Sequence, residues 1–385
     1  MIYLDHAATT QISDEALEVY VNVAKHYFGN TNSLHDEGSA AKQILEASAK
    51  TIASTINARP QDIFFTSGAS EGNFLAIYSL LRASSKGGHV ITTQVEHSSV
   101  ENVYLKLEED GYEVTRLSTD ESGIIDIEEL KRSIREETVL VSIQHVNSEI
   151  GVIQDIKKIG ALLDEHDILF HSDCVQSYGR LDLDIQVLNI DAITVSSHKI
   201  YGPKGVGAVW IDPAADRKAV IPNPDKTGVI RQGTDDVPAI AAFATAAKLI
   251  HLNKESEQKR LKSFRNELIN ELHKMEFDVK IVGDTNKSVP NILGLRFPGI
   301  EGQYLMLECN QAGLAISTGS ACQVGSDRPN RTMSALGKSE QEAREFIRLS
   351  FGTANNVGQI PQIIEKMSVI LERHFDKVNF YRKKG

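Results

Sequence analysis

The chain has 385 residues, of which 41% are hydrophobic and 24% charged, a composition typical of a globular protein with two or three domains. Its formal net charge of -11 disfavours non-specific binding to nucleic acid, so we expect no direct nucleic-acid partner. Met1 leads into IYLDHAATT with no basic segment followed by an apolar run. We therefore expect a cytoplasmic protein without a secretory signal or a membrane span.

Apolar, β-branched runs alternate with helical patterns through the first two thirds of the chain, and seven of them are expected to form strands. These runs cover residues 62–65, 89–93, 112–116, 138–143, 167–172, 191–196 and 206–211. The alternation predicts an α/β fold with a mostly parallel sheet covered on both faces. Only residues 197–205 separate the last two runs, too few for a crossover helix, so we expect these strands to be antiparallel and to carry Lys199 on their connection.

The pattern changes after Leu249 to a long charged helix, followed by short strands around residues 279 and 292–297 and by further helices. A smaller α+β domain is the natural interpretation. We expect a large domain over residues 15–250 and a small C-terminal domain over 251–385, which also takes in residues 1–14. The stretch 360–375 has apolar residues at helical spacing and predicts a covering helix.

Polar residues follow the ends of several of the predicted strands. In an open α/β sheet, ligands bind in the crevice beyond the carboxyl ends of the strands. Five residues are expected to meet there: Glu96, His97, Asn147, Asp173 and Lys199.

The stretch IFFTSGASEGNFLAI takes a strand through small polar residues into a helix that Ser70 or Glu71 opens. The unpaired N–H groups at such a helix start, beside small residues, can bind a phosphate. The alternative is an ordinary turn with a serine cap. Since GxxxxGK[ST] is absent, a nucleotide P-loop is not expected.

Asp173, in FHSDCVQSYG, follows an apolar run that predicts a central strand. A buried carboxylate there requires a cationic partner or several donors, and a cofactor pyridinium would serve; the alternative is a cap for the next segment. Together with Lys199, His97 and the phosphate cradle, these are the parts that a phosphate-bearing pyridine aldehyde requires: an amine for a Schiff base, an acid for the ring nitrogen and an anion site.

Nine ordered motifs cover nearly the whole chain: YLDHAATT, FGNTNSLH, FTSGASEGNFLAI, EHSSV, HVNSEIGVIQDI, HSDCVQSYG, SSHKIYGPKGVGA, STGSAC and IRLSFG. In these motifs the sequence resembles the fold-type I enzymes that use pyridoxal 5'-phosphate (PLP), and more narrowly the class V group containing the NifS and IscS cysteine desulfurases. The resemblance implies a homodimer that converts L-cysteine to L-alanine and passes the sulfur, as an enzyme-bound persulfide, to an acceptor protein. An iron–sulfur scaffold or a tRNA or cofactor thiolation enzyme would be such an acceptor.

The resemblance also assigns the site. Lys199 would carry PLP as a Schiff base, with Asp173 at the ring nitrogen and Gln176 at the ring hydroxyl. His97 would stack on the ring and assist proton transfer, and Arg348 would bind the substrate carboxylate. The phosphate would be held by Ala69, Ser70, Ser196, His198 and, from the neighbouring subunit, Thr234.

Cys322, in AISTGSACQVGSDRPN, lies in a stretch of Ser, Gly and Asp that predicts an accessible loop. Isolated cysteines are more often inert and buried than nucleophilic, but the STGSAC context matches the family's catalytic loop. Cys174 and Cys309 are expected to be packing residues. His35, His145 and His171 form no recognisable metal set, and we expect no metal.

Three positions depart from the family pattern: Ser148 stands where a second Asn is common, Thr31 where Pro is usual, and PNPDKTGVIRQGT replaces a glycine-rich loop before Thr234. The alternatives to desulfuration of cysteine are a selenocysteine lyase or another class V aminotransferase. From a different class of protein, a non-catalytic scaffold of sulfur assembly is also an alternative.

Overall fold

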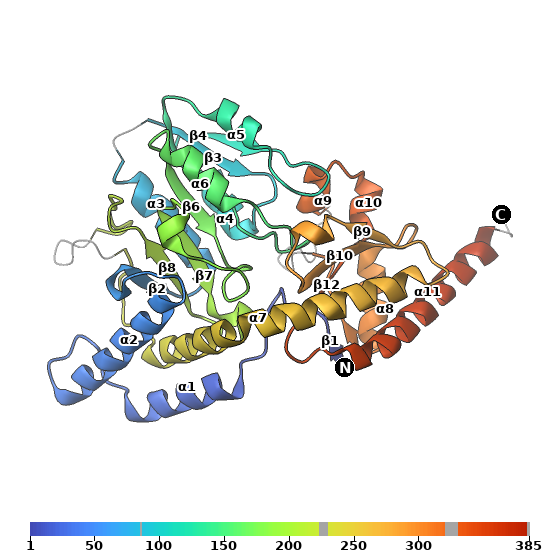
Figure 1. The fold of residues 1–385 in the computed structure, drawn as a ribbon, viewed down its shortest axis with the longest axis horizontal. Helices are drawn as coiled ribbons and strands as arrows, with labels where there is room; N and C mark the ends of the chain where they lie inside the picture. Colours follow the sequence, from blue (N-terminus) through green and yellow to red (C-terminus); the bar gives the residue numbers. More distant parts are fainter. Residues whose placement is uncertain (85–86, 223–229, 320–329, 383–385) are drawn as a thin grey trace.

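A computed structural model of the chain describes residues 1–84, 87–222, 230–319 and 330–382. Its largest sheet has seven strands in the order β2-β8-β7-β6-β5-β3-β4 (Figure 1). The strands are β2 (Ile63–Thr66), β3 (His89–Thr93), β4 (Glu113–Leu117), β5 (Thr138–Ser142), β6 (Leu169–Asp173), β7 (Ala192–Ser196) and β8 (Gly207–Ile211). All seven predicted strands are confirmed.

The strand directions follow the lengths of the connections. Strands β3 to β7 pair in parallel, whereas β8 is antiparallel to both β7 and β2. The short β7–β8 connection begins with a 3-10 turn over Ser197–Lys199. The predicted antiparallel pair, with Lys199 on its connection, is therefore confirmed.

Both faces of the central strands of the large sheet are buried, because these strands contribute residues to two different cores. One face packs against α3 (Ala69–Leu81) and α4 (Ser98–Glu109), and the other against α2 (Asp36–Ser54), α6 (Ile156–Asp164) and the start of α7 (Val237–His273). Ala192 and Ile193, for example, are neighbours in β7 and enter opposite cores. Two further helices complete this part, α1 (Asp14–His26) and α5 (Ile127–Ser133).

A second core surrounds a three-stranded sheet in the order β12-β10-β9. Its strands are β9 (Lys280–Val282), β10 (Ile292–Arg296) and β12 (Phe346–Ser350). The helices after α7 are α8 (Gly302–Gln311), α9 (Arg331–Ala335), α10 (Glu340–Arg344) and α11 (Ile360–Arg382). The covering helix predicted over residues 360–375 is confirmed as part of α11.

Helix α7 contributes residues to both cores, and the N-terminal end of the chain pairs with a strand of the C-terminal part. Helix α7 contributes Phe243 to the core of the large sheet and Phe264 to the second core, and Figure 1 shows it running from one sheet toward the other. Strand β1 (Ile2–Tyr3) pairs with β11 (Leu314–Ala315), so the N-terminal segment packs with the C-terminal part. The domain boundary predicted at residues 250 and 251 falls inside α7 and remains a prediction.

Candidate active site

A cavity of about 490 Å³ lies beyond the carboxyl ends of the parallel strands. It is lined by eight of the residues assigned above: Ala69, Ser70, His97, Asp173, Gln176, Ser196, His198 and Lys199. Ala8, Thr9, Ser148 and Lys204 also line it. The predicted convergence is therefore correct for His97, Asp173 and Lys199, whereas Glu96 and Asn147 are buried and do not line the cavity.

The Lys199 amine is held inside this cavity by the N-terminal segment. Its Nζ donates to the carbonyl oxygens of Ala7 and Ala8 at 2.6 and 2.8 Å. Burial, together with the positive charge of Arg348, lowers the pKa of Lys199 to about 8. The neutral form of this amine, which is the nucleophile, is therefore far more populated near physiological pH than it is for a lysine with the ordinary pKa of 10.5.

Asp173 is 6% exposed and forms no ion pair within the described residues, and its contacts there are hydrogen bonds. One oxygen accepts from the Val175 N–H at 3.0 Å, the turn-capping contact, and the other from Asn73 Nδ2 at 2.9 Å. The capping alternative is thus correct for one oxygen. Both contacts leave the carboxylate on the cavity wall, available to a cationic ring nitrogen.

Asn73 is a residue that the sequence analysis missed. Its Nδ2 also donates to Ser99 Oγ at 2.9 Å, and Ser99 Oγ lies 2.8 Å from His97 Nδ1. The same Nδ1 accepts the Ser99 N–H at 3.1 Å, so the neutral ring carries its proton on Nε2. Burial lowers the pKa of His97, and the nearby Asp173 counters this in part. One buried amide therefore orients both the acid and the imidazole.

The start of α3 is open to an anion. The helix begins at Ala69, with Gly68 as its N-cap and no side-chain capping bond, so the serine-cap alternative is wrong. Gly68 has a φ of 146°, and a Cβ built on it would meet no atom within 4 Å. Helix N–H groups and a backbone position open to the cavity suit a phosphate. Ser196 Oγ, in a residue 1% exposed, is a further buried group without a partner among the described residues.

The other predicted cofactor contacts differ in how fully they are satisfied. Gln176 donates through Nε2 to the Ala7 carbonyl at 3.0 Å, while its Oε1 is buried without a partner in the described part of the chain. His198 Nδ1 lies 3.1 Å from Thr9 Oγ1, and burial lowers the pKa of His198 to about 4. His198 is therefore neutral and would bind a phosphate as a hydrogen-bond donor and not as a charge.

Arg348 lies on β12 and is not among the residues that line the cavity. Its guanidinium forms an ion pair with Asp5 at 2.7 Å and donates to the Ser148 carbonyl at 2.9 Å. Its Nε is buried and has no partner among the described residues. Ser148 is one of the residues that line the cavity, so the departure from the family pattern falls at a residue that contacts both Arg348 and the cavity.

Two predicted residues lie away from the described lining. Thr234 is exposed, between β8 and α7, and does not line the cavity of this chain. Cys322 lies outside the described residues. The chain before it passes beside Arg348, because Ser317 and Arg348 pair through backbone bonds of 3.2 and 2.6 Å. A Cβ on Gly319 would lie 2.4 Å from Asn330 Nδ2, so the residues described on either side of that segment are neighbours.

The two other cysteines and His171 have structural surroundings. Cys174 and Cys309 are buried, and burial raises the pKa of each thiol to about 12. His171 lies between Ser142 Oγ and Thr194 Oγ1, at 2.8 and 3.0 Å.

In the part of the chain that the structure describes, no helix combines the length and the hydropathy needed to cross a membrane.

Comparison with known proteins agrees with this geometry. Residues 2–363 match the family described as Aminotransferase class-V. The chain belongs to this family. Among class V relatives, a protein of Bacillus subtilis (strain 168) named "Putative cysteine desulfurase NifS" is 45% identical over 97% of this chain and 95% of its own length. The "Cysteine desulfurase IscS 1" of Archaeoglobus fulgidus is 34% identical over the full length of both.

Two solved structures share the fold of this chain. A "NIFS-LIKE PROTEIN" superposes with a TM-score of 0.90, at 28% identity, and the match covers 96% of this chain and 99% of that one. A structure titled "SspA in complex with cysteine" has a TM-score of 0.79 and 32% identity, over 91% of this chain and 99% of that one. The predicted family and the predicted fold are therefore confirmed.

Proposed function

We propose that this chain is a cysteine desulfurase that converts L-cysteine to L-alanine, using PLP bound at Lys199 and Cys322 as the sulfur acceptor. The observation that carries the proposal is the Lys199 amine, whose pKa burial lowers to about 8, in one cavity with Asp173 and the open start of α3. The names of the full-length relatives support the substrate and the reaction.

The residues of the cavity fit PLP. The start of α3 and the unpartnered Ser196 Oγ suit its phosphate, while Asp173, with no basic side chain paired to it in the described residues, suits its ring nitrogen. The unpartnered Gln176 Oε1 suits a ring hydroxyl. When bound, PLP would supply a sink for the electrons released as the substrate Cα loses its proton.

The protein's own groups then divide the remaining tasks. The Lys199 amine, whose lowered pKa increases its neutral fraction, would bind the cofactor and move the Cα proton. His97, neutral with its proton on Nε2, would donate a hydrogen bond from that atom to a group in the site. Arg348 binds the substrate carboxylate through its guanidinium, for which Asp5 already fixes one nitrogen.

Cys322 collects the sulfur. Its thiolate would attack the substrate sulfur, forming the sulfur–sulfur bond of a persulfide as the carbon–sulfur bond breaks. The substrate β-carbon would keep the bonding electron pair and take up a proton, so that alanine leaves and the persulfide remains on Cys322. The neighbouring contacts of Ser317 with Arg348 place the described end of that segment beside the carboxylate-binding residue. The proposal also includes a homodimer, in which the exposed Thr234 would reach the phosphate bound by the partner subunit. The persulfide would then be transferred to an acceptor protein.

The test uses purified protein reconstituted with PLP and supplied with L-cysteine. Wild type is expected to form alanine and, without an acceptor, one extra sulfur on Cys322. Cys322→Ala should retain bound PLP but form no persulfide, and Cys174→Ala is the matched control because Cys174 is buried. Alanine formation that proceeds unchanged in Cys322→Ala would contradict the proposed role of that residue. Turnover with a keto acid as amino acceptor would instead indicate an aminotransferase.

A further inference from the structure

Tyr201, two residues after Lys199, has a backbone conformation that its residue type disfavours. Among the described residues, four that are not glycine have a positive φ. Three of them, Asn57, Asp167 and Asn189, are of the types that adopt this conformation most readily. Tyr201, with a φ of 68°, is the bulky exception. A strained residue beside a reactive group points to a function of its side chain.

The backbone of Tyr201 is fixed by the N-terminal segment. Its N–H donates to Thr10 Oγ1 at 2.7 Å, and its carbonyl accepts the Ser13 N–H at 2.9 Å. The same segment holds the Lys199 amine through the Ala7 and Ala8 carbonyls. These bonds would serve a glycine equally well, because they involve only the main chain of residue 201. They explain the turn but not the tyrosine.

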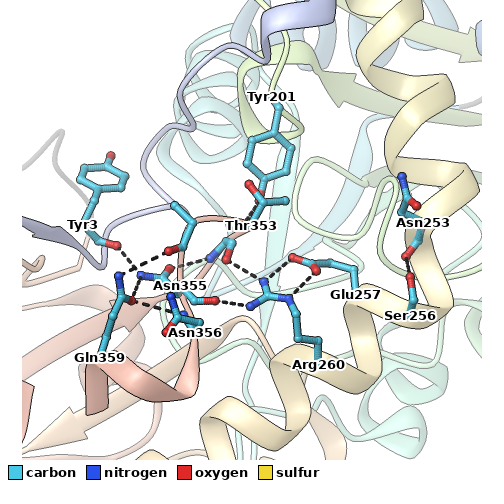
Figure 2. Close-up of polar contacts among 12 residues, drawn as sticks. Tyr3, Tyr201, Asn253, Ser256, Glu257, Arg260, Thr353, Asn355, Asn356 and Gln359 are labelled. Atoms are coloured by element: carbon cyan, nitrogen blue, oxygen red, sulfur yellow. Dashed lines mark hydrogen bonds and ion pairs between the residues drawn. The ribbon is translucent and has the colours of Figure 1, made fainter. Parts of the chain in front are cut away.

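The side chain of Tyr201 reaches a different part of the molecule. Its Oη accepts the Thr353 N–H at 3.0 Å, just after the strand that carries Arg348 (Figure 2). A Cβ on Gly352 would lie 2.7 Å from Tyr201 Oη and 2.4 Å from His6 Nδ1, so only a glycine allows this close approach. Tyr201 does not line the cavity that contains Lys199, and therefore does not touch the substrate.

The turn that receives Tyr201 is itself firmly held. Arg260 on α7 donates to the Gly352 carbonyl at 2.8 Å and to the Asn355 carbonyl, and it is paired with Glu257 at 2.7 Å (Figure 2). Asn355 donates to the Tyr3 carbonyl at 3.1 Å and accepts the Gly352 N–H at 2.9 Å. The Thr353 N–H is thus held in a fixed position. Its hydrogen bond to Tyr201 can therefore fix the position of the β7–β8 connection that carries Lys199, here called the Lys199 turn.

We propose that Tyr201 is a positioning residue that fixes the Lys199 turn against the segment following Arg348. In this way it sets the separation between the amine and the guanidinium. The inference rests on the proposed function, because that separation decides whether a substrate carboxylate reaches Arg348 while the substrate amine is at the Lys199 site. Tyr201 keeps its strained backbone because neither glycine nor asparagine could reach Thr353.

The test compares Tyr201→Phe, which loses only the hydroxyl, with Tyr78→Phe, which loses a hydroxyl bonded to Asp110 at 2.7 Å on the exposed side of α3. In PLP-loaded protein, Tyr201→Phe should raise KM for cysteine about fivefold, equivalent to one neutral hydrogen bond, with kcat within about twofold. Tyr78→Phe should change neither constant. Tyr201→Gly, which relieves the strained φ, should show at least the KM increase of Tyr201→Phe.

A second measurement uses the cofactor-free protein, so that it does not depend on the reaction. Hydrogen exchange of the Thr353 amide should be faster in Tyr201→Phe than in wild type and unchanged in Tyr78→Phe. A wild-type KM or an unchanged Thr353 exchange rate in Tyr201→Phe would overturn the inference. Failure of wild type to form alanine would overturn the proposed function instead, and the exchange measurement would still decide the role of Tyr201.

Discussion

Replacement of Asp5 by alanine should destabilise the cofactor-free protein by about 3 kcal/mol, because it leaves a buried guanidinium without its carboxylate. The Arg348 side chain is 3% exposed and that of Asp5 20%, with 2.7 Å between the paired atoms. Because water can reach the Asp5 side of the pair, the loss in the free energy of unfolding should lie at the low end of the range for breaking a buried ion pair, which is about 3–5 kcal/mol. Asp5→Asn keeps an acceptor for Arg348 and should cost about 1 kcal/mol.

Urea unfolding measures this difference, followed by circular dichroism and by the fluorescence of Trp210, the single tryptophan. The transitions seen by the two probes must coincide for the free energies to be compared. Glu271→Ala is the control, because the pair of Glu271 with Lys274 is 38% and 69% exposed and should contribute less than about 0.5 kcal/mol. Equal losses for Asp5→Ala and Asp5→Asn, or a loss for Asp5→Ala no larger than that of the control, would refute the reasoning.

Two further substitutions test buried groups around the cavity. Asn73→Leu removes the donor to Asp173 and should weaken PLP retention about tenfold, measured by absorbance after dialysis; wild-type retention would contradict this role. Burial raises the pKa of Glu96 from 4.5 to about 8, so the folded protein binds the extra proton between these values and loses stability as the pH rises through them. Glu96→Gln should lack this loss. If the urea midpoints of wild type and Glu96→Gln changed equally across that pH range, Glu96 would not be responsible for the loss.

Much of the fold follows from local sequence patterns. Most strands of the large sheet are apolar runs bounded by turn residues, and the nine residues 197–205 between the last two predicted runs are too few for a crossover helix, which is enough to predict an antiparallel pair. The residues around Lys199 could be predicted for the same reason, since parallel strands bring their carboxyl ends to one edge. The shared helix α7 could not be placed in this way, because its two halves serve two different cores.

The missed residues depend on contacts between distant parts of the chain. Asp5 and Arg348 are 343 positions apart, and no local pattern pairs them. Asn73 has a weak local signal, as a lone amide within the apolar run of α3, but the groups it orients come from α4 and β6. The strained φ of Tyr201 depends on bonds from residues 10 and 13 and has no signal in its own segment.

The covalent site of the cofactor tests the central claim most directly. The protein should be loaded with PLP, reduced with borohydride and digested, and the modified peptide identified by mass spectrometry. We predict one pyridoxyl group, on Lys199, and none on the neighbouring Lys204, which also lines the cavity. A pyridoxyl group on Lys204 alone, or on no lysine of the cavity, would contradict the account.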